Sequence, residues 1–286
     1  MPISPQDALY GFAAPALVAA AVFWIASRFL SESARERWPA SLALIAGFLT
    51  GYALLKLEPW QPTSYWHWTP YVLALAAVIG SVSAAQGISL IERLLLYAAA
   101  AWIAAWFLVP NYDDLEPSRM TYLIVWPLYL LAIAYALDLL SRQLTGPLLP
   151  TVVTLSMAAG LVIVFLSGSA KFMQLYGFGF AAMGGVALGS LFSKEKPALL
   201  GAALLATFLS AGYLLVAKTQ SFTRIPMICY VLPPIAPVTL WIAQWKPLAQ
   251  RPGITGLILR LLVPAVICGV AVGLAAWAER DALSEL

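Results

Sequence analysis

Three carboxylates lie close together in the short segment Asn111–Glu116, namely Asp113, Asp114 and Glu116. Clustered carboxylates at a membrane edge could hold Mg²⁺ and act on the diphosphate of a lipid or isoprenoid substrate. Such chemistry needs a second acidic cluster across the ion, and Asp138 stands alone. The plainer interpretation is a solvated loop in which Asp113 or Asp114 caps the next helix. We therefore expect no metal site and rank a lipid- or isoprenoid-modifying membrane enzyme last.

Aromatic residues crowd the segment Trp60–Tyr71, which also holds His67, the only histidine of the chain. Rings with polar edges, such as Trp66, could stack on a sugar, a quinone or a lipid headgroup. The alternative is a belt of aromatic rings at headgroup depth, where Trp and Tyr concentrate in membrane proteins. One histidine supports neither a two-histidine metal site nor haem held by two histidines. No cofactor is expected.

Lys171 follows the segment Ser167–Ala170, in which a glycine is flanked by two serines, and it precedes Gln174. A helix break that offers hydroxyls and one cation could bind an anionic group between two spans. A simple loop lysine is the competing interpretation. We take Lys171 and Gln174 as candidate substrate contacts, together with Trp66 and His67.

Polar residues near the ends of other apolar stretches give three more candidates. Ser83 and Gln86 could line a polar path through the third span. Asp138 is a functional candidate because charges inside a membrane are costly, although Arg142 lies four residues later on the same helix face and can neutralise it. The adjacent pair Glu92-Arg93 is expected to be solvated in a tight turn.

Prolines interrupt one apolar stretch near its middle, at Pro233, Pro234 and Pro237. Each proline removes one backbone hydrogen bond of a helix, so residues 232–237 cannot form one regular helix. The freed carbonyl groups must be satisfied by neighbouring groups or by water. We interpret the three prolines as a hinge or as the wall of a binding cavity, and a kink that only shapes packing is the alternative.

Small residues recur along the seventh apolar stretch, where Ala181, Gly185 and Gly189 follow each other at four-residue spacing. Helix backbones approach closely where side chains are this small. These residues are expected to pack against another helix, and the same face could join two copies of the chain in an oligomer.

The elements that must position these residues follow from composition. The 286 residues are 62% hydrophobic and only 10% charged, whereas a soluble domain carries about 25% charged residues. Stretches without charge are long enough to cross a bilayer, which takes roughly 20 residues as a helix. The fold class is therefore an all-α polytopic integral membrane protein with about ten transmembrane helices and short loops. The predicted spans are residues 8–28, 38–57, 70–87, 89–109, 120–141, 148–168, 172–192, 197–217, 226–245 and 256–278.

Nine spans remain an alternative if residues 70–87 or 89–109 form a re-entrant segment. The chain is expected to be a single transmembrane domain, residues 1–286, with possible halves 1–145 and 146–286 of five spans each. The first stretch lacks a basic segment before it, so it is read as a retained span. A net charge of +3 without a basic cluster gives no footprint for nucleic-acid binding.

Orientation follows from the Lys and Arg residues in alternate loops. One side carries six of the 16, namely Lys56, Arg119, Lys171, Lys218, Arg224 and Arg280, and the other side carries the rest. The richer side is expected to be cytoplasmic. This rule places both termini on the outer side of a membrane, which we take to be a bacterial cytoplasmic membrane.

The leading hypothesis for function is a secondary transporter or permease-like protein for a small molecule. Its support is the broken helix near residues 233–237, the polar positions of the third span and the short loops. The alternative is a non-catalytic membrane subunit of a larger complex, with a membrane protein as its partner. We favour a protein that is not an enzyme, and its expected surroundings are the lipid bilayer.

Overall fold

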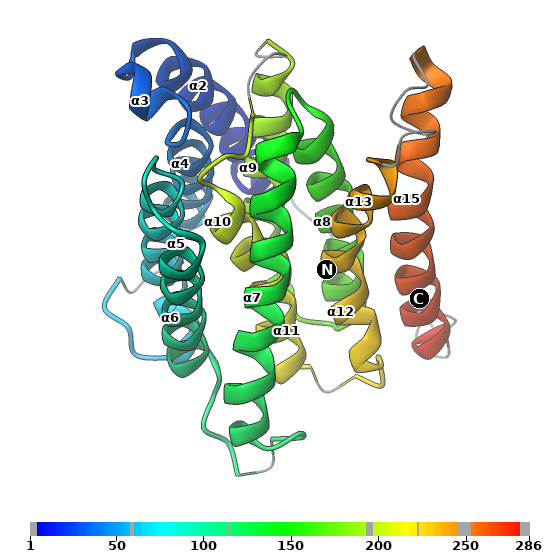
Figure 1. The fold of residues 1–286 in the computed structure, drawn as a ribbon. Coiled ribbons are helices and arrows are strands. Elements are labelled where there is room, and N and C mark those ends of the chain that lie inside the picture. The colour runs from blue at the N-terminus through cyan, green and yellow to red at the C-terminus, as the bar shows by residue number, and fades with distance from the viewer. Residues whose placement is uncertain are drawn as a thin grey trace.

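A computed structural model describes residues 5–57, 60–113, 115–192, 197–221, 223–244 and 253–280 of the chain. Helices follow one another along this part of the sequence and form a bundle (Figure 1). Their bounds are α1 Pro5–Ala8, η1 Leu9–Ala13, α2 Ala14–Phe29, α3 Glu32–Arg35, α4 Pro39–Leu54, η2 Tyr65–Trp68, α5 Thr69–Ser83, α6 Leu90–Leu108, α7 Arg119–Gln143, α8 Leu148–Leu166, α9 Ala170–Ser190, α10 Ala203–Thr207, η3 Phe208–Gly212, α11 Tyr213–Thr219, α12 Met227–Ile235, η4 Ala236–Thr239, α13 Leu240–Ala243 and α15 Gly253–Ala278.

Six helices of the described residues are long and apolar enough to cross a membrane. The prediction of an all-α membrane protein is thereby confirmed. The six are Leu9–Phe29, Leu90–Leu108, Arg119–Gln143, Leu148–Leu166, Ala170–Ser190 and Thr255–Ala278.

The other four predicted spans also coincide with helical segments, but those segments are shorter. The helix α5 has 15 residues, which is about 22 Å of helix against a hydrocarbon core of roughly 30 Å. The segment Ala203–Thr219 contains the π-helical turn η3, and the segment Met227–Ile242 contains the 3₁₀ turn η4. The structure thus gives six full-length helices where the hydropathy pattern predicts ten.

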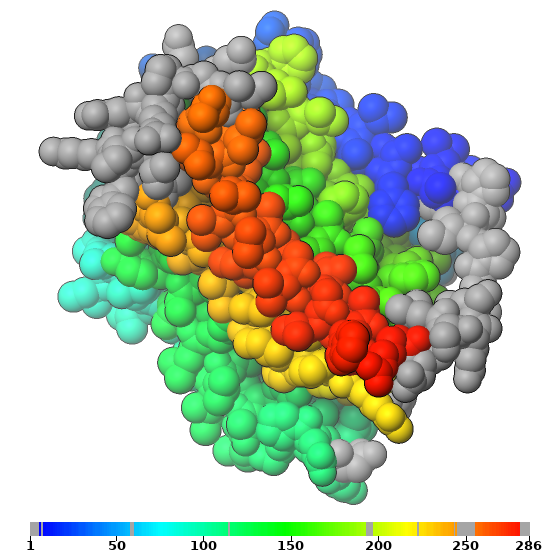
Figure 2. Space-filling view, turned by 90° about the vertical axis from the view of Figure 1, so that its right-hand side faces the viewer, coloured from blue at the N-terminus to red at the C-terminus, as the bar shows by residue number. Residues whose placement is uncertain are grey.

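The helix α9 lies in the middle of the bundle, in contact with α2, α4 and α8. Further along the bundle, α6 packs on α7, and α15 packs on α8 and α12. In Figure 1 the helices α4, α5 and α6 lie at one side and α15 at the opposite side. Within α15, only 17% of an apolar stretch of 18 residues is buried against the rest of the chain. Figure 2 shows α15, coloured orange to red, along an outer face of the molecule beside the yellow α12.

Two glycines of α9 lie directly against α2. A Cβ atom added at Gly185 would lie 2.3 Å from the carbonyl oxygen of Ala16, and one added at Gly189 would lie 2.8 Å from a ring carbon of Phe23. Such close approach is possible only where no side chain intervenes. The neighbouring Ala181 is buried as well. Gly185 and Gly189 thus pack against α2 of the same chain.

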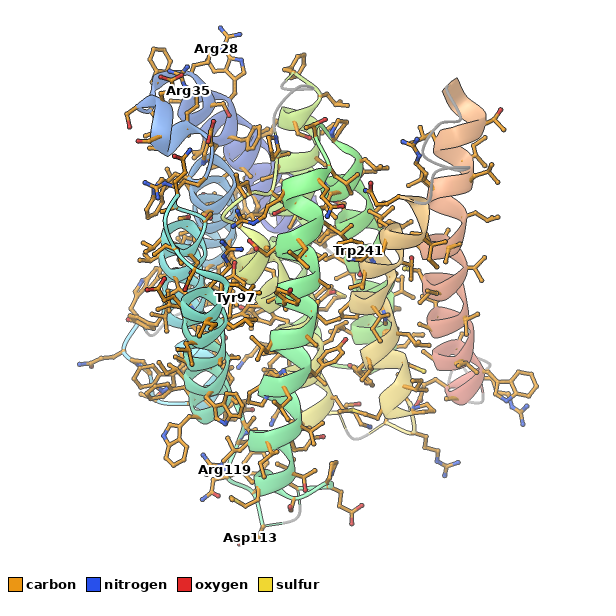
Figure 3. The ribbon with its side chains drawn as sticks, viewed as in Figure 1. Arg28, Arg35, Tyr97, Asp113, Arg119 and Trp241 are labelled. Atoms are coloured by element: carbon orange, nitrogen blue, oxygen red, sulfur yellow. The ribbon has the colours of Figure 1, made fainter. Side chains whose placement is uncertain are left out.

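The two ends of the bundle carry different charged residues. Figure 3 shows Arg28 and Arg35 at one end and Asp113 and Arg119 at the other; we call these the Arg28 end and the Arg119 end. The guanidinium carbon of Arg28 lies 4.4 Å from the ring centre of Trp24, and that of Arg119 lies 5.1 Å from Trp106. Indole rings paired with arginine at both ends fit the aromatic belts of a membrane protein.

Candidate functional site

The aromatic segment folds around His67, whose side chain is only 4% exposed. The ring atom Nδ1 accepts hydrogen bonds from the backbone N–H groups of Thr63, at 3.1 Å, and Ser64, at 3.2 Å. Since Nδ1 is an acceptor here, the ring proton of the neutral histidine sits on Nε2. His67 therefore holds the turn that leads into α5.

Lys171 meets this segment from the first turn of α9. Its ammonium nitrogen lies 4.2 Å from the ring centre of Trp66, a cation–π contact. The structure thus brings together three of the candidate residues, Trp66, His67 and Lys171. Trp66 and His67 are buried, while Lys171 is exposed and Gln174, one turn further along α9, is half-buried.

Burial first, and then the positive charge of Lys171, lower the pKa of His67 below its ordinary value of 6.5. Protonation at Nδ1 would also break the two hydrogen bonds that this atom accepts. A group whose pKa is lower in the folded than in the unfolded state adds stability that is present above pH 6.5 and is lost as the pH falls through the folded pKa.

We therefore predict that the melting temperature of the detergent-solubilised protein falls between pH 7 and pH 5, and that His67→Asn removes part of this fall. The asparagine side-chain oxygen can accept the same backbone hydrogen bonds but does not titrate in this range. Thermal unfolding of both proteins at several pH values checks the prediction. If the melting temperatures of the two proteins fall equally between pH 7 and pH 5, His67 does not cause the fall.

A second cluster lies at the opposite end of α5. Asp138 of α7 is completely buried and accepts hydrogen bonds from Arg93, at 3.0 Å, and from Tyr97, at 3.3 Å. Arg142, one turn further along α7, approaches the same carboxylate at 3.1 Å. The three charges hold the ends of α6 and α7 together, and we call these four residues the Asp138 cluster.

The Asp138 cluster corrects one expectation. Arg93 is not solvated in a turn, because only 9% of it is exposed and its Nε donates to the backbone carbonyl of Ser83 at 3.1 Å. Its neighbour Glu92 does lie at the surface, where it caps the first turn of α6 through Ser89. The hydropathy pattern did not indicate that Arg93 is buried. The four-residue spacing of Arg93 and Tyr97 does place both on one face of α6.

The candidate residues of the third span do not join the Lys171 group. Ser83 is the last residue of α5, whereas Trp66 and His67 immediately precede that helix. Gln86 lies beyond the end of α5 and is exposed. The candidates predicted from sequence therefore separate into one group at each end of α5.

The proline segment begins as the α-helix α12 and continues as a 3₁₀ turn from Ala236. Pro233 and Pro234 lie inside α12, and the 3₁₀ turn η4 follows. Pro237 has no N–H to offer the carbonyl group of Pro233 four residues earlier. The backbone N–H of Ala236 and the buried hydroxyl of Ser156 on α8 donate to that carbonyl.

A second side chain supports the same segment. The hydroxyl of Tyr129 on α7 donates to the carbonyl oxygen of Val231 at 2.8 Å. The expectation that neighbours satisfy carbonyls freed by the prolines is met at Pro233 by Ser156, whereas the Val231 carbonyl that Tyr129 contacts is not freed by a proline, since residue 235 is an isoleucine. Neither Ser156 nor Tyr129 was identifiable from the sequence, because each lies on another helix, 77 and 102 positions away respectively.

The acidic loop offers no complete set of metal ligands in the part of the chain that the structure describes. No group of three or more His, Cys, Asp or Glu side chains there could hold an ion. Asp113 lies at the Arg119 end of the bundle (Figure 3). Asp114, the other candidate of this loop, lies outside the described residues.

The chain matches no protein-family model, and no curated protein sequence is significantly similar to it. Its function therefore has to be inferred from the residues and contacts described above.

Proposed function

We propose that this chain is a ten-span membrane protein that moves a small molecule across the bilayer, as a secondary transporter or permease does. The observation that carries the proposal is the proline segment α12–η4–α13. Inside the bundle, the carbonyl group of Pro233 in this segment accepts a hydrogen bond from a serine of another helix in addition to one from the backbone N–H of Ala236, three residues later. Helices that are discontinuous within the membrane are typical of secondary transporters.

The energetics favour movement at this point. A regular helix resists bending because each bend breaks backbone hydrogen bonds inside a medium that offers no replacement. Here the bond from residue 237 to the carbonyl group four residues earlier is already missing, and the backbone N–H of Ala236 and the hydroxyl of Ser156 donate to that carbonyl, while the hydroxyl of Tyr129 donates to the carbonyl of Val231. The segment can therefore change its angle by exchanging side-chain partners. In the proposal it pivots there while α7 and α8 stay in place.

The Arg119 end faces outward in this proposal, since it carries the smaller number of Lys and Arg residues. The Trp66–Lys171 contact then lies at the outer surface. Lys171 is exposed there and can meet an anionic group before it enters the bundle. Both termini are on the outer side of a bacterial cytoplasmic membrane.

We predict that Pro237→Ala slows transport by about tenfold or more, because a proline in a helix interior disfavours the straight helix by about 3 kcal/mol and alanine removes that bias. The substrate is unknown, so the measurement compares cells that express the protein with cells that carry an empty vector. Mass spectrometry of cell extracts and medium finds the metabolites whose distribution depends on the protein. The variant is then compared for those metabolites.

The matched control is Pro264→Ala, which makes the same change inside the peripheral helix α15. It is expected to leave the metabolite distribution unchanged. Membrane levels of both variants are measured by quantitative blotting. Equal transport by the wild type and Pro237→Ala would exclude the pivot, and no protein-dependent metabolite at all would exclude transport.

The second candidate function, a subunit of a larger membrane complex, is favoured by one observation. The helix α15 buries little of its surface within the chain. A partner helix packed on the exposed face of α15 would raise the buried fraction of α15 toward the fractions of the other long helices. Native mass spectrometry of the gently extracted protein tests this candidate, since a stoichiometric protein partner would be expected and a lone chain would contradict it.

A further inference from the structure

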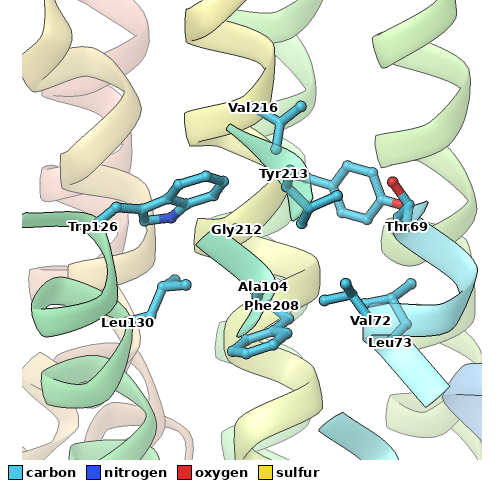
Figure 4. Close-up of a pocket in the computed structure, with 11 residues that line it drawn as sticks. Thr69, Val72, Leu73, Ala104, Trp126, Leu130, Phe208, Gly212, Tyr213 and Val216 are labelled. Atoms are coloured by element: carbon cyan, nitrogen blue, oxygen red, sulfur yellow. The ribbon is translucent and has the colours of Figure 1, made fainter. Parts of the chain in front are cut away.

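The run η3–α11, from Phe208 to Thr219, meets two different surroundings. Along most of its length it is buried, and the cavity between it and the helices α5, α6 and α7 has room for about one water molecule (Figure 4). Its last residues, Lys218 and Thr219, are half-buried and lie at the Arg119 end, where the chain turns toward α12 (Figure 1). Because these residues are partly exposed, a solute can reach this turn from the aqueous phase without any opening of the bundle.

Lys218 carries a half-buried positive charge that is not neutralised by a carboxylate. In the part of the chain that the structure describes, both ion pairs involve Asp138, and neither involves Lys218. The Lys218 nitrogen Nζ donates to the carbonyl oxygen of Ile225 at 3.1 Å and lies 5.5 Å from the ring centre of Tyr230. The bond to Ile225 uses one of the three N–H groups of the ammonium group and leaves two for another acceptor. Charges of this kind in membrane proteins are candidate substrate contacts.

Hydroxyl groups surround the same tyrosine. The hydroxyl of Tyr230 donates to Oγ of Ser221 at 3.3 Å, and the hydroxyl oxygens of Ser221 and Thr223 share a hydrogen bond at 2.7 Å. The backbone N–H of Ser221 donates to the carbonyl oxygen of Lys218 at 3.1 Å, so these two residues lie in one turn. Ser221 and Thr223 are half-buried. Since a hydroxyl group can rotate its proton toward a new acceptor, both can donate to a ligand at Lys218.

The Lys218 turn also touches the start of the proline segment. Ile225 lies two residues before α12, and Tyr230 lies in the first turn of that helix. An acceptor that binds the ammonium group of Lys218 competes with the carbonyl group of Ile225. Occupancy of this turn is therefore linked to the position of α12, which is the part of the chain that pivots in the proposed function.

We propose that Lys218 binds an anionic group, such as a carboxylate or a phosphate, where α11 turns toward α12, with the hydroxyl groups of Ser221 and Thr223 as further donors. The ammonium group supplies the opposite charge. A neutral ligand would leave that half-buried charge uncompensated, so the site discriminates by charge. Under the proposed function the bound anion is the transported molecule, and the exposed Lys171 at the same end attracts it.

The test uses the full chain in nanodiscs of phosphatidylcholine, whose headgroup carries no net charge. The 12 tyrosines are replaced by 3-fluorotyrosine, and the fluorine NMR resonance of Tyr230 is assigned as the one lost in Tyr230→Phe. The soluble probes are propionate, propionamide, which has the same shape without the charge, and inorganic phosphate, all at constant ionic strength. Nanodiscs that contain phosphatidylglycerol, an anionic lipid, test a headgroup phosphate as the source of the anion.

We expect propionate to shift the Tyr230 resonance saturably and propionamide to bind at least about tenfold more weakly, because hydrogen bonds to charged groups are the stronger ones. Lys218→Gln should weaken the binding of propionate at least about tenfold. Lys218→Arg, which keeps the charge, should retain saturable binding. Lys56→Gln is the matched control, since it removes the same charge from an exposed position, and it should leave the binding of propionate unchanged.

The lipid arm distinguishes the two sources of the anion. If phosphatidylglycerol shifts the Tyr230 resonance without a soluble probe and prevents a further shift by propionate, the site holds a lipid headgroup. If propionate or phosphate shifts the resonance equally in both kinds of nanodisc, the site takes a soluble anion. Either result supports an anion site at Lys218.

Several results would overturn the proposal. Equal affinities for propionate and propionamide would show that the charge of Lys218 is not used. Unchanged binding of propionate in Lys218→Gln, or an equal loss of binding in Lys56→Gln, would show that the anion is attracted elsewhere. No shift with propionate, phosphate or phosphatidylglycerol would show that Lys218 only holds the carbonyl group of Ile225. If Lys218→Gln does not fold, the comparison of propionate with propionamide on the wild type still decides.

The inference rests on the proposed function only in taking the bound anion to be the transported molecule. Binding is measured at equilibrium and without transport. Saturable binding of propionate by a protein that redistributes no metabolite would overturn the transport proposal and keep the site. Transport that persists in Lys218→Gln, together with a failure of all anions to bind the wild type, would overturn the site and keep the transport proposal.

Discussion

Replacing Asp138 by asparagine is expected to destabilise the protein by about 3–5 kcal/mol, because it leaves buried guanidinium groups without their counter-charge. Asp138 is 0% exposed, and Arg93, its partner at 3.0 Å, is almost as deeply buried. Asparagine keeps the shape of the side chain and one acceptor oxygen but removes the negative charge. The melting temperature in detergent should fall by about 6 °C or more.

The other members of the Asp138 cluster provide the controls. Arg142→Gln should cost less, because its side chain is 32% exposed and the pair of Asp138 with Arg93 survives its loss. The double replacement of Arg93 by methionine and Asp138 by leucine should recover much of the stability lost in Asp138→Asn, since apolar pairs can replace buried ion pairs at little cost. A melting temperature of Asp138→Asn equal to that of the wild type would show that the buried charges are paired in another way.

Much of the helical framework was predictable from the sequence. Each stretch without charge coincides with a helical segment, because a charge in the hydrocarbon core is costly and marks where a span must end. Span lengths were less predictable. Proline shortens the regular helix at Pro237, and a π-helical turn divides the segment of α10 and α11. Hydropathy averages over such turns, since it measures composition and not hydrogen bonding.

Contacts within one helix were also readable, and contacts between helices were not. The approach of Arg142 to Asp138 follows from four-residue spacing on α7. The contact of Arg93 with the same carboxylate joins residues 45 positions apart. Hydropathy places a residue at a depth in the membrane, but it does not give the rotation of a helix about its axis or the identity of its neighbour. For the same reason the Trp66–Lys171 contact was visible only in the structure.

Gly185→Ala is expected to be the most damaging single-methyl change on α9. The added Cβ would lie 2.3 Å from the carbonyl oxygen of Ala16 and 3.0 Å from the backbone nitrogen of Ala20. These are backbone atoms of α2, so the clash can be relieved only by moving the two helices apart. Overpacking of this kind costs about 1–3 kcal/mol or more. A fall of several degrees in the melting temperature in detergent is the expected result.

The adjacent residue gives a matched control for the same helix. A Cβ atom at Gly184 would meet only a methyl group of Thr154, at 3.8 Å, and alanine is a better helix former than glycine by up to about 1 kcal/mol. Gly184→Ala should therefore be neutral or slightly stabilising. If both variants melt like the wild type, α2 and α9 are not in close contact.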